Sequence, residues 1–300
     1  MAMAGPQVRY LPDETGENGR LHLQHGPIDL IIGVDGSRAT RAFCFEQATI
    51  RFETILEELV SELAFLRSPA MPGMPPAKGR TAGRMVEAVR SFAGERFITP
   101  MAAVAGGVAD EMLAAMLQAL PKYQYPARAY VNNGGDIALH LEGDAEFRVK
   151  MSREDNATLG YFSVDAAGAS RGIATSGRGG RSLSMGIADS VTVVARTAAL
   201  ADAAATLIAN AVDLPGHPSI ERVPASELVD NSDLGDRLVV HSCGPLSGPE
   251  IDGALARGLA EADRLIALGL VEKTALFLKD QGRLATGQQT QLETPAVRAG

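Results

Sequence analysis

The spacing of the apolar residues changes at Pro126, and this change constrains the fold more than any other feature of the chain. Before Pro126 the apolar residues recur every three or four positions, which predicts helices over 42–66, 81–92 and 101–120. After it they alternate, which predicts strands over 128–131, 137–141 and 147–151. Long helices and runs of strands without a regular alternation are typical of an α+β fold. We therefore predict a mainly antiparallel sheet packed with long helices.

Further elements follow along the chain. Strands are predicted over 28–34, 190–195, 237–241 and 275–278, and helices over 198–211 and 249–268. The proline-rich stretch 68–79 cannot continue a helix and predicts a surface loop. We expect residues 1–27 to form a polar arm, either frayed or a short edge hairpin. A single domain is expected over 28–284, and a disordered polar tail over 285–300.

Composition narrows the function classes. The net charge of −8, without a block of like charges, argues against nucleic acid and against an anionic membrane surface as partners. No window approaches the ~20 consecutive apolar residues of a membrane span, and the first residues lack the layout of a signal peptide. Cys44 and Cys243 are too few for a zinc cluster. We expect a cytoplasmic protein with small-molecule partners; its oligomeric state is left open.

A glycine turn lies between two of the predicted strands. Asn133, Gly134, Gly135 and Asp136 belong to a run of residues that tolerate positive φ, which is typical of a hairpin turn. Two successive glycines followed by an acid also let the backbone approach a ligand closely. The turn is therefore a candidate cofactor-binding segment, and a purely structural turn remains the alternative.

A basic, glycine-rich loop is the second candidate. Thr175, Ser176, Gly177, Arg178 and Arg181 combine hydroxyls, unhindered N–H groups and guanidinium groups, which suits phosphate oxygens. The loop lacks the Lys-Ser/Thr pair of a Walker motif, and no strand–GxGxxG–helix unit surrounds it. A solvated loop explains the same residues equally well.

Asp202 and Thr206 are the third candidate. Four residues apart on the alanine-rich helix, they share one face, and their oxygens suit a hard cation such as Mg²⁺. The alternative is that Asp202 lies in the first turn of its own helix and stabilises the helix dipole without a metal. The five histidines form no recognisable catalytic pattern, and no Gly-x-Ser-x-Gly motif is present.

Taken in order, five blocks of the sequence resemble the ApbE family, the FAD:protein FMN transferases. The resemblance covers roughly 99–212, and its last block is Ala-Asp-x-x-x-Thr on a helix after a Ser-Val-Thr-Val strand. The blocks are 102–110, 131–137, 174–177, 190–194 and 201–206.

The resemblance implies an α+β fold that binds FAD in a cleft, with Mg²⁺ bridging the diphosphate. It also implies transfer of FMN to a Thr or Ser hydroxyl of an acceptor protein. By matching motif positions, Asp202, Thr206 and the backbone carbonyl of Ala105 would be the metal ligands. The segments Gly134 to Asp136 and Thr175 to Gly177 would line the flavin cleft.

The chain departs from the family pattern at two informative places. The family's Ala-Lys-Gly is Ala105, Gly106 and Gly107 here, and its His-x-x-Asp-Pro element is reduced to Gly186 through Ser190 without a histidine. No catalytic residue is therefore assigned. Three hypotheses follow: a Mg²⁺-dependent enzyme acting on a flavin or another diphosphate coenzyme, a flavin- or nucleotide-binding protein without turnover, and a scaffold that has lost the ligand.

Overall fold

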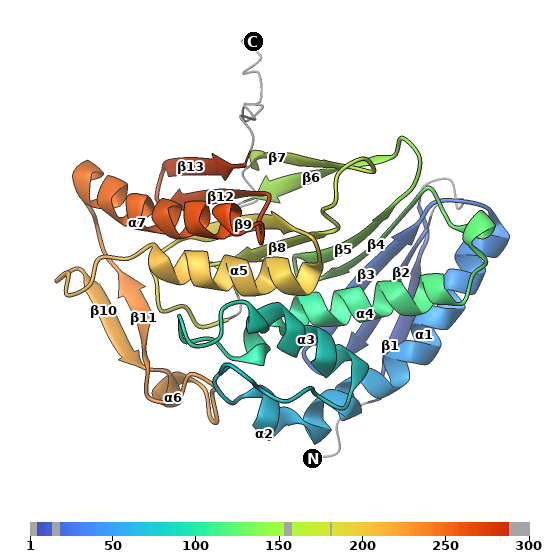
Figure 1. Cartoon of the computed structure of the whole chain (residues 1–300), viewed down its shortest axis with the longest axis horizontal. Helices are drawn as coiled ribbons and strands as arrows, with labels where there is room; N and C mark the ends of the chain where they lie inside the picture. Colours follow the sequence, from blue (N-terminus) through green and yellow to red (C-terminus); the bar gives the residue numbers. More distant parts are fainter. Residues whose placement is uncertain (1–4, 14–18, 153–157, 181, 288–300) are drawn as a thin grey trace, which may run out of the picture.

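A nine-stranded sheet, antiparallel throughout, forms the centre of the molecule (Figure 1). The computed structural model describes residues 5–13, 19–152, 158–180 and 182–287. The strand order is β1-β2-β3-β4-β5-β8-β9-β12-β13. These strands are β1 (Gln7–Leu11), β2 (Arg20–His25), β3 (Ile28–Val34), β4 (Arg128–Asn133), β5 (Asp136–Leu141), β8 (Gly172–Ser176), β9 (Ser190–Ala195), β12 (Lys273–Leu278) and β13 (Gln281–Thr286).

The long helices cover one face of this sheet, and the larger hydrophobic core lies between the two layers (Figure 1). They are α1 (Arg38–Ser61), α3 (Arg80–Arg90), α4 (Val104–Gln118), α5 (Ala198–Ala211) and α7 (Gly248–Ala267). Shorter helical turns are α2 (Leu63–Leu66), η1 (Pro100–Ala103), η2 (Lys122–Gln124) and α6 (Ala225–Leu228). Helix α5 packs under β8 and β9, next to α4. The predicted α+β fold with a mainly antiparallel sheet is confirmed.

A separate hairpin covers part of the opposite face. Strands β6 (Glu146–Ser152) and β7 (Thr158–Asp165) pair with each other, and Phe162 and Val164 pack against Ile173 of β8 in a second, smaller hydrophobic cluster. A further hairpin, β10 (Ile220–Pro224) and β11 (Leu238–Cys243), lies beyond the far end of α5 (Figure 1). The central sheet is therefore covered by helices on one side and by a hairpin on the other.

Of the two alternatives for the N-terminal residues, the structure has the short edge hairpin and not the frayed arm. Strands β1 and β2 form a hairpin at its edge, and Leu21 and Leu23 are buried, so the sheet begins before residue 28. At the other end, β13 extends to Thr286, past the expected start of the tail, and 288–300 lie outside the described residues. The sequence of β13, with glycine and arginine at its second and third positions, lacks the apolar alternation that reveals a strand.

One described segment, Pro100–Gln118, is long and apolar enough to cross a membrane by length and composition. In the fold it forms η1 and α4, packs against α1, α3 and α5, and has 56% of its most apolar window buried. The core helix of a folded domain has this same composition.

Helices α4 and α5 approach each other at Gly106. A Cβ atom at this position would lie 2.2 Å from the carbonyl oxygen of Ala198, so only glycine permits the contact.

We predict that Gly106→Ala lowers the free energy of unfolding by about 1–3 kcal/mol, the usual effect of overpacking. Gly83→Ala in α3 is the matched control, because nothing lies within 4 Å of its added Cβ. The control should gain up to about 1 kcal/mol from helix propensity. Urea unfolding of both variants measures the difference; equal effects would contradict the steric argument.

The N-terminus of α7 depends on an ionised glutamate. Glu250 accepts hydrogen bonds from the backbone N–H of Ser247 (2.6 Å) and from Nε2 of His217 (2.9 Å). These bonds lower the pKa of Glu250 from 4.5 to about 2, and the bond from the Ser247 backbone has the largest effect.

Because the folded-state pKa is depressed, the stabilisation by Glu250 is complete above about pH 4.5 and is lost as the pH falls towards 2. We therefore predict that Glu250→Gln reduces the loss of stability between pH 5 and pH 2.5, as measured by urea midpoints at ~25 °C. An identical pH dependence in wild type and variant would contradict this role.

Candidate functional site

Asp202 of α5 lies against the start of α4. Its Oδ2 accepts a hydrogen bond from the backbone N–H of Gly106 (3.0 Å), and its carboxyl also accepts from the N–H of Ala105. These are the second and third residues of α4, whose N–H groups have no partner within the helix. Asp202 is the fifth residue of α5, so the alternative that it lies in the first turn of its own helix is wrong. It caps a different helix.

Asp110 of α4 makes the corresponding contact with α5. Its two carboxyl oxygens accept from the backbone N–H groups of Ala198 (3.1 Å) and Ala199 (2.9 Å), the first two residues of α5. Burial raises the pKa of Asp110, although these two hydrogen bonds oppose the shift. Each helix therefore supplies the carboxylate that caps the other, on either side of the contact at Gly106.

A third carboxylate completes this cluster. Asp136, the first residue of β5, is buried on the helix face of the sheet, and its Oδ1 accepts from the N–H of Thr175 (3.1 Å). Burial and the negative charge of Asp136 raise the pKa of Asp202 well above its usual value. A positive charge placed between these two carboxylates would relieve their repulsion.

The Ala105 carbonyl and Thr206 are the other two predicted metal ligands. Nδ2 of Asn133 donates to the carbonyl oxygen of Ala105 (3.1 Å), which, as part of α4, also accepts the helix hydrogen bond from the N–H four residues further on. Thr206 lies one turn beyond Asp202 on α5, both are partly exposed among buried alanines, and the Thr206 hydroxyl makes no hydrogen bond with the described residues. Asn133 thus holds the α4 backbone, and its predicted contact with a cofactor stays a prediction.

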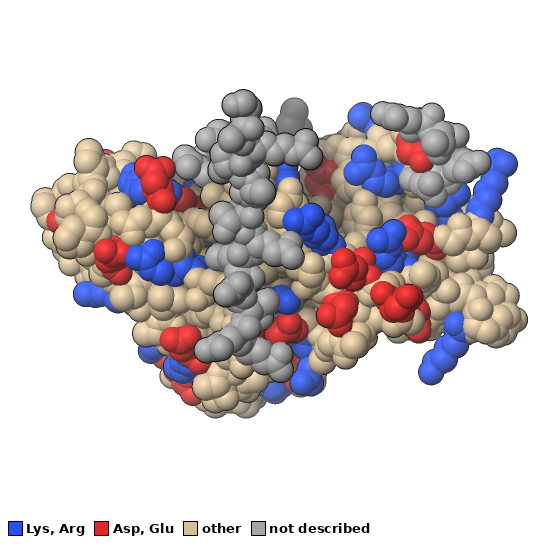
Figure 2. All heavy atoms as spheres, turned by 90° about the horizontal axis from the view of Figure 1, so that it is seen from above, with Lys and Arg blue, Asp and Glu red and all other residues tan. Residues whose placement is uncertain are grey.

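The second part of the site is a cavity on the opposite face of the sheet. It has a volume of about 670 Å³ and lies between the sheet and the β6–β7 hairpin, at the ends of β5, β8 and β9. Gly134, Gly135, Thr175, Ser176 and Arg178 line it. Figure 2 shows the molecule from the side of this hairpin, where acidic and basic side chains lie next to one another.

Asp189 holds the basic loop against the cavity. Its Oδ1 accepts from Nη2 of Arg178 (2.7 Å), its Oδ2 accepts from the backbone N–H of Lys279, and all three residues line the cavity. Gly177, with φ of 143°, passes so close that a Cβ atom would lie 2.6 Å from the Asp189 carbonyl oxygen. The loop is therefore built into the wall, not free in solvent. Arg181 lies outside the described residues.

The sheet separates the predicted site residues into two groups. Ala105, Asp202 and Thr206 lie on the helix face with Asn133 and Asp136. The glycine turn and Thr175 to Arg178 border the cavity on the hairpin face. The two groups meet at one end of the sheet, where the hydrogen bond between Asp136 and the N–H of Thr175 joins them.

Three site residues escaped the sequence reasoning. Asp110 lies inside one of the matched blocks, yet nothing in its neighbours indicates that it caps a helix 88 residues away. Asp189 and Lys279 are joined by pairing of β9 with β12, which a single sequence does not reveal. The positive φ of Lys279 (54°) is visible only in the structure.

Comparison with known proteins identifies the family of this chain. The sequence profile of a family described as AbpE bacteria matches residues 9–288. The chain belongs to this ApbE-like family.

Relatives at the sequence level are archaeal. A UPF0280 protein of Archaeoglobus fulgidus is 35% identical over 54% of this chain and 63% of its own length. One of Methanosarcina barkeri is 36% identical over 46% and 51%, and one of Methanoregula boonei is 30% identical over 61% and 74%. The chain thus spans 63% of the length of the first of these relatives and 51% of the length of the second.

Among solved structures, the flavin transferase ApbE from Vibrio cholerae aligns with 94% of this chain and 96% of its own, at 14% sequence identity and a TM-score of 0.39. The structure of a single-residue mutant of that transferase aligns with 94% of this chain and 97% of its own, at 12% identity and a TM-score of 0.39.

We predict that Asp110→Ala destabilises the protein by about 1–3 kcal/mol, because two N–H groups at the start of α5 lose their acceptor. Asp110→Asn keeps one carbonyl acceptor and should cost less. Thermal unfolding of the two variants provides the measurement. A smaller loss for the alanine variant than for the asparagine variant would refute the capping role.

Proposed function

We propose that the chain binds FAD or a related diphosphate coenzyme in a Mg²⁺-dependent way. The observation that carries this proposal is the pair Asp202 and Asp136, two carboxylates held in electrostatic contact beside the Ala105 backbone. Folding brings together two groups that repel each other when ionised, and a bound cation would remove that repulsion. Membership of the ApbE-like family agrees with this assignment.

The donor set fits magnesium. Carboxylates, a backbone carbonyl and a hydroxyl are hard oxygen ligands, and Asp202, Thr206 and Ala105 would supply one of each. Asp136 would add a further carboxylate from the sheet. Among the described residues, no group of three or more His, Cys, Asp and Glu side chains forms a metal site of its own. A diphosphate would therefore have to provide the remaining ligands, as is usual for protein-bound Mg²⁺.

The protein's own groups would orient the coenzyme. The glycine turn at the end of the sheet leaves room above Gly135, where nothing lies within 4 Å of a hypothetical Cβ. Arg178 is fixed by Asp189 and presents its guanidinium to the cavity. A bound Mg²⁺ would supply neutralisation of diphosphate charge.

FMN transfer to a protein hydroxyl is the second candidate function, and the family resemblance favours it. Such a transfer breaks the phosphoanhydride bond of FAD, joins the FMN phosphorus to a Thr or Ser oxygen, and releases AMP and a proton. A base must accept that proton. No histidine lines the cavity among the described residues. Binding without turnover therefore requires fewer groups than transfer, and it is our preferred function.

We predict that Mg²⁺ and FAD together raise the melting temperature of the wild type, and that Asp202→Asn abolishes the metal-dependent part. The ligand at 100 times its Kd should stabilise by about 2.7 kcal/mol. The asparagine oxygen still accepts from the Gly106 N–H, so the metal-free variant should remain folded. Asp144→Asn, in the exposed β5–β6 turn, is the matched control.

The same proteins incubated with FAD, Mg²⁺ and Thr- or Ser-containing acceptors separate binding from transfer. FAD binding without AMP release identifies a binding protein. AMP release with FMN-labelled acceptor in the wild type, but not in Asp202→Asn, identifies a transferase. A shift in melting temperature that is equal in wild type and Asp202→Asn would refute the magnesium site.

A further inference from the structure

The first turn of helix α1 carries no acidic side chain at its positive end. Residues 36–39 are exposed there, and this 24-residue helix has neither Asp nor Glu in its first turn. The backbone N–H groups of Arg38 and Ala39 make no hydrogen bond with the described residues. In Figure 1 the helix begins at the right-hand end of the molecule, next to the segment that leads into β4. Unpaired N–H groups at the start of a long helix attract negative charge.

Two hydroxyls and a glycine shape this end of the helix. Oγ of Ser37, the N-cap residue, accepts from the backbone N–H of Thr40 (3.0 Å) and shares a hydrogen bond with the Thr40 hydroxyl (2.9 Å). That pair uses one of the two hydroxyl protons, so the other is available to a ligand. Gly36 has a φ of 129°, which side chains rarely permit, and it turns the backbone into the helix.

Arg41, one turn further along α1, is a buried cation without a partner. It is 8% exposed, and its guanidinium makes neither a hydrogen bond nor an ion pair within the part of the chain that the structure describes. Nη1 is fully enclosed, whereas Nε and Nη2 keep contact with solvent. Buried charges are normally paired, because an unpaired one loses its hydration without compensation. A small anion could reach this guanidinium from outside.

Helix geometry directs the Arg41 side chain towards the start of α1. Ser37 lies four residues earlier on the same face, and helical side chains lean towards the N-terminus. An arginine side chain is long enough to cover that turn of about 5.4 Å. Asp35, just before the helix, accepts from Nε of Arg128 (2.7 Å) and does not pair with Arg41. The free N–H groups, a hydroxyl and an unpaired guanidinium therefore belong to one end of one helix.

We propose that the start of α1 binds a phosphate group, held by the guanidinium of Arg41, by Arg38 and by the N–H groups of the first turn. Oxygens of a phosphate accept from helix N–H groups and from guanidinium groups alike. One bound anion would satisfy both the free N–H groups and the buried charge.

This site is separate from the residues of the proposed function. The N–H of Asp35 donates to the carbonyl of Arg128 (2.8 Å), so α1 begins beside the first residue of β4. The glycine turn follows the last residue of that strand, Asn133. At about 3.4 Å per residue, roughly 17 Å separate the two ends of β4. The phosphate site therefore does not rest on the proposed function.

Two variants remove different parts of the site. Arg41→Met keeps an unbranched side chain of similar length and should fold, because the charge that it removes has no partner. Arg38→Pro removes a guanidinium and an N–H at the first helical position. Ser37 already has φ of −63° and ψ of 156°, the extended conformation that a residue before proline adopts, so the helix can still begin there.

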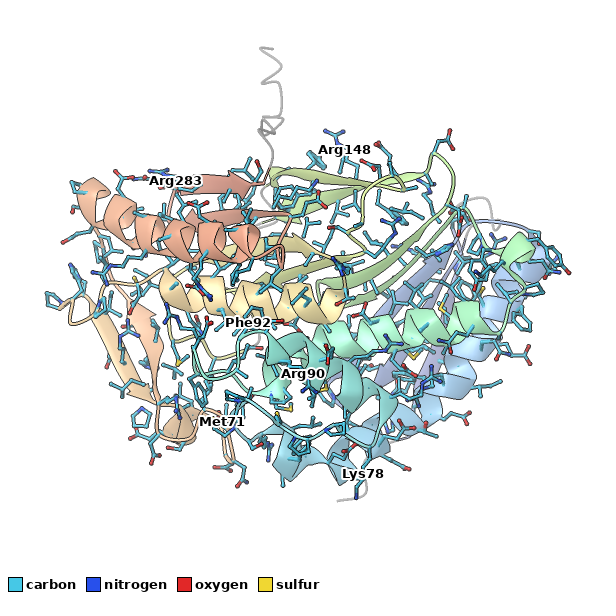
Figure 3. The ribbon with its side chains drawn as sticks, viewed as in Figure 1. Met71, Lys78, Arg90, Phe92, Arg148 and Arg283 are labelled. Carbon is cyan, nitrogen blue, oxygen red and sulfur yellow. The ribbon has the colours of Figure 1, made fainter. Side chains whose placement is uncertain are left out.

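Arg90→Met is the matched control, because it removes the same charge from another helix. Arg90 is the last residue of α3 and pairs with Glu87 at the surface (3.0 Å), an ion pair that contributes little to stability. Figure 3 shows Arg90 at the lower centre of the molecule, away from the right-hand end where α1 begins.

The experiment measures binding of inorganic phosphate and of phenyl phosphate to the full chain by calorimetric titration, at constant ionic strength in chloride. The wild type and Arg90→Met should bind phosphate with equal affinity. Arg41→Met and Arg38→Pro should each bind at least about tenfold more weakly, the usual effect of losing a charge-assisted hydrogen bond. Equal binding of both ligands identifies a site for the phosphate of a larger molecule, and binding of inorganic phosphate alone identifies a site for the free ion.

The outcomes are decisive for this site alone. Equal phosphate affinity of the wild type and both α1 variants overturns it, and so does a wild type that binds no phosphate in chloride. Arg178 of the cavity is another cation that phosphate could reach. Phosphate binding that is lost in Arg178→Gln and retained in Arg41→Met assigns the anion to the cavity and overturns the inference. Asp202→Asn should bind phosphate like the wild type, so failure of the magnesium site leaves this one standing.

Discussion

The reciprocal capping of α4 and α5 is the interaction on which the site depends. Asp202 binds the first N–H groups of α4, Asp110 binds those of α5, and the glycine at position 106 lets the backbones approach closely enough for both. Each carboxylate gains hydrogen bonds to a helix N-terminus, where negative charge is favoured. The same geometry leaves Asp202 beside Asp136 with a raised pKa. The contact that joins the two helices thus also places Asp202 where burial and the negative charge of Asp136 raise its pKa.

The central sheet separates two groups of side chains that differ in their chemistry. Strand alternation sends Asp136 and Asn133 towards the helices, and Thr175 and Ile137 towards the hairpin. The helix face provides hard oxygen ligands, and the hairpin face provides an apolar slot with a cationic end. The carboxylates and the apolar cavity therefore belong to different faces of the sheet, which meet at the glycine turn between β4 and β5.

The sequence pattern predicted the bounds of an element correctly where its apolar residues have one clear periodicity and its ends are well marked. The strand Ser190–Ala195 and the helix Ala198–Ala211 have the predicted bounds, because a β-branched run ends where the alanine-rich stretch begins. Strand β13 was missed because a glycine and an arginine interrupt its alternation, and β8 because its five residues, Gly-Ile-Ala-Thr-Ser, show no alternation of polar and apolar types. The sequence placed Asp202 and Thr206 on one helix face, but the partner of Asp202 lies 96 residues away. Contacts of that kind depend on how the helices and strands pack in three dimensions. The order of these elements along the chain does not reveal that packing.

The hydrogen bond between the Lys279 N–H and Asp189 joins the wall of the cavity that is synthesised last to a wall that is synthesised earlier. The last wall of the cavity comes from β12 and the turn after it, near the C-terminal end of the described chain, whereas the other walls are encoded from residue 132 onwards. The cavity is therefore closed on that side by the pairing of β12 with β9. A ligand of this cavity therefore finds all of its walls in place only after β12 has paired with β9.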